Sequence, residues 1–194
     1  MSRAVVFLLF AFLFANQLTG QCDSLIVKVV DDFDSTRIFY STAVNIGYLI
    51  PSQVETVEGL KLVEEAKAFF AFSENDTLES FFLTFAVQER EYRRVMTDTN
   101  YVLIKLNDGR ILPLMSAPDK GVFDRNTNMR QYLHTCVIPY DLVFSLTLMK
   151  IDKIRIEYEG GYKHTITLIE PQKEALKQRI ICVAEALGLL ETKP

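Results

Sequence analysis

The sequence predicts an α+β fold, with mostly antiparallel strands in a sandwich or a curled sheet and a C-terminal helix packed on it. Three observations favour this class. Short β-branched or aromatic runs alternate with turn residues, Asp108-Gly109 joins two such runs, and the last 25 residues carry apolar side chains at helical spacing. With 49% hydrophobic residues in a chain of 194, the protein is too apolar to be disordered.

Residues 1–21 are typical of a secretory signal peptide. Arg3 precedes a 12-residue apolar run at 4–15, which is shorter than the ~20 residues that a membrane-spanning helix needs. We therefore expect a single β-rich domain over 22–194, secreted or periplasmic, with no transmembrane span. A lipid anchor at Cys22 is the less favoured alternative, because Gln21 separates this cysteine from the Leu-small-small triplet that precedes an acylated cysteine.

The expected strands come in pairs that are joined by turns. They are 25–30, 37–42, 60–72, 80–87, 101–106, 110–114, 131–138, 154–158 and 162–169. The segment 60–72 is ambiguous, because its Leu, Glu, Ala and Lys content is typical of a helix. Apolar residues of one parity favour a strand, which would form a long hairpin with 80–87. We expect 45–58 to be irregular, 117–129 to be a polar loop and 140–149 to be a short helix.

The last element is predicted to be a helix that begins near Pro171 and ends near Gly188. Its apolar stripe consists of Leu176, Ile180, Val183, Leu187 and Leu190. A stripe of this kind packs against a sheet.

The three cysteines are expected to include one disulfide, since exported chains reach an oxidising compartment. We favour Cys136 with Cys182, because Cys22 lies at the frayed end of the mature chain. Closing that loop would stabilise the fold by on the order of 4 kcal/mol. Cys22 would then be free, lipidated or paired between chains.

The histidines and cysteines raise the question of a metal site. His134 and Cys136 share one face of a strand, and with His164 and Cys182 they match the ligand types of a zinc site. The spacings and the oxidising compartment disfavour thiolate ligation. We therefore expect no metal, and interpret the two histidines as surface residues.

Two acidic segments are interpreted as turns. Residues 124–128 match the start of a calcium loop, but Met129 replaces the required glycine and Thr135 replaces the final glutamate. The acidic segment 31–35 is interpreted as a hairpin turn.

Catalytic and nucleic-acid signatures are missing from the sequence. It contains no glycine-rich phosphate loop, G-x-S-x-G or H-E-x-x-H, so no catalytic residue and no cofactor is predicted. Nothing distinguishes a hydrolytic pair among the 25 acidic residues, and the net charge of -4 argues against nucleic acid.

One aromatic cluster stands out. Six of the 14 phenylalanines fall in the expected hairpin of 60–87: Phe69, Phe70, Phe72, Phe81, Phe82 and Phe85. Adjacent pairs make both faces of the hairpin apolar. The favoured interpretation is a strand pair buried on both sides. In the alternative, one face is a binding surface.

Three segments resemble a loose group of exported β-rich domains of Gram-negative bacteria whose function is unassigned. They are DDFDSTRIFYST at 31–42, YVLIKLNDGRILPL at 101–114, and IDKIRIEYEGGY at 151–162, followed by a cysteine-bearing helix. The resemblance implies an envelope or secreted setting and a β-rich fold with a C-terminal helix. It implies no catalytic residues.

The first functional hypothesis is an exported, non-enzymatic module that binds a protein or an envelope component. The second is a carrier that holds a small apolar ligand between sheet and helix, and the third is a hydrolase with unmarked carboxylates.

Overall fold

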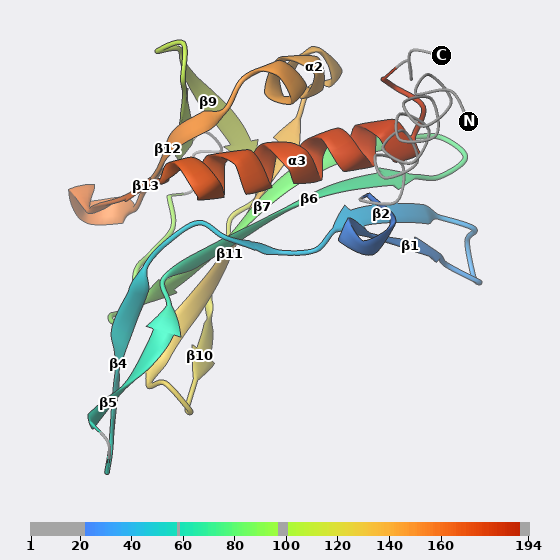
Figure 1. The fold of residues 1–194 in the computed structure, drawn as a ribbon. Helices are drawn as coiled ribbons and strands as arrows, with labels where there is room; N and C mark the ends of the chain where they lie inside the picture. The colour runs from blue at the N-terminus through green and yellow to red at the C-terminus, as the bar shows by residue number, and fades with distance from the viewer. Residues whose placement is uncertain (1–21, 58, 97–100, 191–194) are drawn as a thin grey trace, which may run out of the picture.

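A computed structural model describes residues 22–57, 59–96 and 101–190 (Figure 1). In chain order the elements are η1 (Asp23–Leu25), β1 (Ile26–Val30), β2 (Arg37–Ser41), β3 (Val44–Asn45), β4 (Leu49–Thr56), β5 (Gly59–Glu64), β6 (Ala66–Glu74), β7 (Glu79–Glu89), β8 (Val102–Leu106), β9 (Ile111–Ser116), β10 (Val122–Asp124), β11 (Met129–Ile138), α2 (Tyr140–Leu148), β12 (Ile151–Glu157), η2 (Glu159–Gly161), β13 (Lys163–Thr167) and α3 (Glu170–Ala186). The predicted signal peptide lies outside the described residues.

The predicted α+β class is confirmed. One 11-stranded sheet has the order β1-β2-β6-β7-β11-β9-β8-β12-β13, with β3 paired to β6 and β10 to β11, and β4 and β5 form a second, two-stranded sheet. The strand pairs within the described residues are antiparallel. In Figure 1, α3 lies along one face of the sheet beside α2, and β4 and β5 extend away from the helices.

The core lies between α3 and the sheet. Strand β6 alternates strictly, so that Ala68, Phe70 and Phe72 are buried while Lys67 is exposed. The helix contributes Leu176, Ile180 and Val183 of the predicted stripe, each at most 1% exposed. Pro171 lies in its first turn, and Gly188 follows it with a positive φ of 70°, as predicted from the helix stop signal.

Four predicted hairpins are confirmed: β1–β2, β6–β7, β8–β9 and β12–β13. Gly109 between β8 and β9 has a φ of 92°, which is why Asp-Gly marks this turn well. The predicted short helix is α2.

The preference for strand over helix at 60–72 is confirmed, but Glu65 bends the chain, so that the segment forms two strands, β5 and β6. The Glu65 carboxylate accepts a hydrogen bond from Tyr48 N at 3.1 Å. Two other local predictions were wrong. The segment expected to be irregular contains β3 and β4, which pair with β6 and β5. The polar loop contains β10, which pairs with β11. Both errors concern strands whose partners lie in another segment, and composition does not show such pairing.

Candidate functional site

The six phenylalanines of the predicted binding surface do not lie on one surface. Phe70, Phe72, Phe81 and Phe85 belong to the core and are at most 4% exposed, whereas Phe69 and Phe82 are half-buried on the opposite face. The favoured burial on both sides therefore holds for one face of the hairpin, and the other face, with Phe69 and Phe82, is only partly buried. The adjacent pairs account for this division, because consecutive residues of a strand point to opposite faces.

The face that carries Phe82 has a continuous line of apolar side chains, here called the outer row. It crosses six neighbouring strands and consists of Val27, Tyr40, Ala71, Phe82, Val137 and Met115. Each member lies directly opposite the next in the strand register. Met115 is 58% exposed and Val137 41% exposed. The outer row faces away from the core that α3 covers.

The positions beside the outer row are also uncharged. On one side lie Phe69, Thr84 and Thr135, which are opposite one another, and the two threonine hydroxyls are 3.3 Å apart. On the other side lie Ile38 and Ser73. The result is a sheet face without charged side chains along these three lines, on which Thr84 is buried and the outer row is partly exposed.

The sequence did not reveal this surface because it depends on register. Tyr40, Val137 and Met115 come from strands far apart in the chain, and each is an ordinary apolar residue in its own strand. One signal was present in the sequence: several strands carry apolar residues at both odd and even positions, and therefore on both faces of the sheet. Which of these align across the sheet is decided by pairing alone.

His134 is a core residue, so its predicted surface position was wrong. Its ring is fully buried, with Nε2 3.1 Å from the hydroxyl of Tyr158 and Nδ1 3.5 Å from that of Tyr101. Burial lowers the pKa of His134 to about 4, so the imidazole is neutral at pH 7. Burial likewise raises the pKa of Tyr158, helped by the negative charge of Glu89.

His164 is held between two carboxylates, and it is not a surface residue either. Its Nδ1 lies 2.7 Å from Glu89 Oε1 and its Nε2 lies 3.1 Å from Glu65 Oε1. Burial alone would lower the pKa of His164, but the hydrogen bonds and charges of Glu65 and Glu89 outweigh it and raise this pKa to about 9. The hydrogen bond to His164 in turn lowers the pKa of Glu65. With both ring nitrogens engaged, this charged group joins strands rather than transferring protons.

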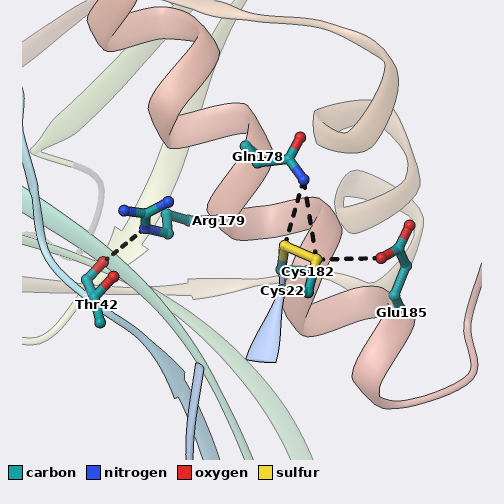
Figure 2. Close-up of a disulfide and its surroundings, with 6 residues drawn as sticks. All are labelled: Cys22, Thr42, Gln178, Arg179, Cys182 and Glu185. Atoms are coloured by element: carbon teal, nitrogen blue, oxygen red, sulfur yellow. Dashed lines mark hydrogen bonds between the residues drawn. A yellow bond between two sulfur atoms is a disulfide. The ribbon is translucent and has the colours of Figure 1, made fainter. Parts of the chain in front are cut away.

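The predicted disulfide between Cys136 and Cys182 is also wrong. Cys182 is bonded to Cys22, with the two Cα atoms 5.2 Å apart (Figure 2). The reason is the course of α3, which runs along the sheet until Cys182 reaches the segment before β1. Within α3, Gln178 Nε2 donates a hydrogen bond to Cys182 Sγ at 3.4 Å. Arg179 Nε of the same helix donates to Thr42 O, just after β2, at 3.3 Å. The helix is therefore attached to the N-terminal strands both by the disulfide and by this hydrogen bond.

Cys136 is the free cysteine among the described residues, and it is buried. Its Sγ lies 2.8 Å from Ser116 Oγ on the neighbouring strand β9. Burial raises the pKa of the Cys136 thiol to about 12, so it carries no thiolate at neutral pH.

The structure does not bring the four zinc-type residues together, because Cys182 is in the disulfide and His164 is bound by carboxylates. Within the described ranges, one group of metal-ligand types is closely spaced: Cys22, Cys182 and Glu185. Both of its sulfurs belong to the disulfide, which leaves a single carboxylate as a ligand.

The two acidic segments form turns, as predicted. Asp124 Oδ1 accepts a hydrogen bond from Asn126 N at 2.9 Å in the turn between β10 and β11. Asp31 Oδ1 accepts one from Phe33 N at 2.8 Å in the turn between β1 and β2. Both carboxylates bind local backbone, which is the ordinary role of aspartate in a turn.

Among the described helices, none combines the length and the apolar character needed to cross a membrane. Comparisons with protein-family models, with curated proteins and with solved structures found no match.

Proposed function

We propose that this protein is an exported, non-enzymatic module that binds a protein partner through the outer row. The main support for this proposal is the continuous apolar line from Val27 to Met115 on the face of the sheet opposite α3. The Cys22–Cys182 disulfide supports an oxidising, non-cytoplasmic setting.

The size of this surface favours a folded protein as the partner. Six strands at a spacing of about 4.8 Å make the outer row about 24 Å long. Met115, Val137, Val27 and Tyr40 of this row are 36–58% exposed, and contiguous exposed apolar surface is typical of interaction sites. An apolar sheet face can pack against another sheet or a helix.

The pair of acids beside His164 does not favour the hydrolase hypothesis. Glu65 and Glu89 are brought together, but each binds a nitrogen of His164. A general acid and a nucleophile need carboxylates that are free to face a substrate. The pair therefore stabilises the fold.

The experiment places a charge in the middle of the outer row. Purified Met115→Lys and Val137→Lys variants are compared with wild type as immobilised bait for proteins of the native extracellular or envelope fraction. The matched control is Leu148→Lys, which changes a 71% exposed residue at the end of α2. Circular dichroism and urea unfolding establish that all variants remain folded.

We expect wild type and Leu148→Lys to retain the same partner, and both outer-row variants to lose it. Light scattering at rising protein concentration identifies the case in which that partner is a second copy. If the outer-row variants retain the partner as well as the control does, or if wild type retains none and stays monomeric, the proposed function is wrong.

A further inference from the structure

A second surface lies on the helix side of the sheet, at the end of the sheet near the tip of the β6–β7 hairpin. Phe39, Phe72 and Phe81 lie directly opposite one another on β2, β6 and β7. The ring centroids of Phe39 and Phe72 are 6.2 Å apart, and those of Phe72 and Phe81 are 4.8 Å apart. Tyr140 at the start of α2 extends this wall, with its ring 6.0 Å from that of Phe81. Four aromatic rings thus form one continuous wall.

The next line of residues on the same face is charged. Arg37, Glu74 and Glu79 lie directly opposite one another, two residues further along the same three strands. Arg37 forms an ion pair with Glu74. Glu79 forms no ion pair with any residue that the structure describes. Its negative charge, at the edge of the aromatic wall, is therefore not neutralised by Arg37, which pairs with Glu74.

These two lines border a cleft of about 260 Å³. Its opposite wall comes from the end of α3 and the residues after it, namely Ala186, Leu187 and Leu189. A polar hollow adjoins the cleft at Glu74 and Glu79 and adds the carboxylate of Asp76. The cleft therefore combines an aromatic wall, an aliphatic wall and a charged edge, at which Arg37 is paired with Glu74 and Glu79 leaves a net negative charge.

We propose that this cleft binds a small organic cation with an alkylated ammonium head group. Aromatic faces attract cations through their quadrupole, and walls of several rings are suited to quaternary ammonium groups. The fold already contains one such contact here, since Lys28 Nζ lies 5.6 Å from the ring centroid of Phe39. Because Lys28 already lies over Phe39, and because Phe72 and Phe81 are each only 4% exposed, the ring face that the cation contacts is that of Tyr140, which is 52% exposed. Glu79 supplies the opposite charge.

The shape and composition of the cleft select among cations. A volume of about 260 Å³ lies below the usual range for drug-sized ligands, so the cleft accepts a head group rather than a large molecule. An unalkylated ammonium ion is strongly hydrated, and it would lose water against the apolar walls while finding acceptors only at the charged edge. A trimethylammonium group carries methyl groups that pack on both walls. This site lies between sheet and helix, where a carrier would hold its ligand, but its chemistry is cationic rather than purely apolar.

The test uses calorimetric titration of the oxidised protein with choline. Two comparison ligands separate charge from shape: 3,3-dimethyl-1-butanol has the same shape without the charge, and methylammonium has the charge without the methyl shell. We expect choline to bind more tightly than either by about fivefold or more. Equal binding of choline and its neutral isostere would show an apolar cleft, and no binding of choline would overturn the proposal outright.

Two variants localise the binding. Tyr140→Leu removes a 52% exposed ring, and Glu79→Gln removes the unpaired charge without changing the side-chain shape. Each should weaken choline binding by about fivefold. The control Glu55→Gln removes an exposed carboxylate from β4 and should leave binding unchanged. A loss of binding in the control equal to that in Glu79→Gln would mean that overall charge, and not this cleft, holds the cation.

Discussion

His164 Nδ1 lies 2.7 Å from Glu89 Oε1, although β13 and β7 are separated by β11, β9, β8 and β12 in the order of the sheet. The contact shows that the sheet curls until its last strand faces its middle. The second carboxylate, Glu65, comes from the bend between β5 and β6. One imidazolium ring therefore joins three parts of the chain in a half-buried position.

The pH dependence of this contact is our first prediction. Because the folded-state pKa of His164 is raised to about 9, its stabilising effect is complete below the unfolded value of 6.5 and is lost as the pH rises towards 9. The shift corresponds to on the order of 3 kcal/mol. Urea unfolding from pH 6 to pH 10 should show this loss in wild type, and His164→Gln should show a flatter curve. Parallel curves for the two proteins would contradict the assignment.

His134 should produce the opposite dependence at low pH. Its folded-state pKa is depressed to about 4, so the unfolded chain takes up the proton first and stability falls as the pH drops from 6.5 to 4. The lowered pKa of Glu65 adds a further loss below its ordinary value of 4.5. NMR titration of the imidazole protons should show His164 charged and His134 neutral at pH 6. A His134 that titrates near 6.5 would mean that its ring is not buried.

The cysteines should react in a fixed order with iodoacetamide. The folded protein should take up no label, because Cys136 is buried and the burial-raised pKa of its thiol leaves no thiolate. Unfolding without a reductant should expose one thiol, and unfolding with a reductant should expose three. A peptide map should place the first label on Cys136. Labelling of Cys22 or Cys182 before reduction would disprove the disulfide.

Loss of the disulfide should weaken both the fold and the cleft. Cys182→Ser opens a loop of 160 residues, and we expect a cost of about 2–5 kcal/mol in the free energy of unfolding. Leu187 follows Cys182 closely and lines the cleft, so choline binding should also fall in the folded variant. Dithiothreitol should reproduce both effects in wild type and add nothing to the variant. Wild type that keeps its stability when reduced would contradict this prediction.

The two faces of the β6–β7 hairpin should differ sharply in mutational cost. Phe70→Ala removes a fully buried ring beneath α3, and we expect a loss of about 3–5 kcal/mol. Phe82→Ala removes a half-buried ring of the outer row and should cost about 1–2 kcal/mol. Urea unfolding of both variants measures the difference. Equal costs would mean that the outer face is covered in solution.

Local chemistry was sufficient to predict the hairpins and the terminal helix. The turn between β8 and β9 follows from Asp108-Gly109, and the end of α3 follows from Gly188, because both depend on residues close in sequence. The functional surfaces could not be predicted in this way. Phe69 and Phe70 are adjacent, yet one lies on the open face and the other in the core.

The sequence by itself determined the α+β class, the positions of four hairpins and the parity of side chains along each strand, since these depend on local propensity and a period of two. Only the tertiary structure decided which strands are neighbours and in which register. Register placed Phe82 opposite Val137, Phe72 opposite Phe81, and Glu74 opposite Glu79. The course of α3 likewise places Cys182 beside Cys22, so that Cys182 forms its disulfide with Cys22 and not with Cys136. Such long-range choices depend on the summed packing of the whole chain, which no single segment encodes.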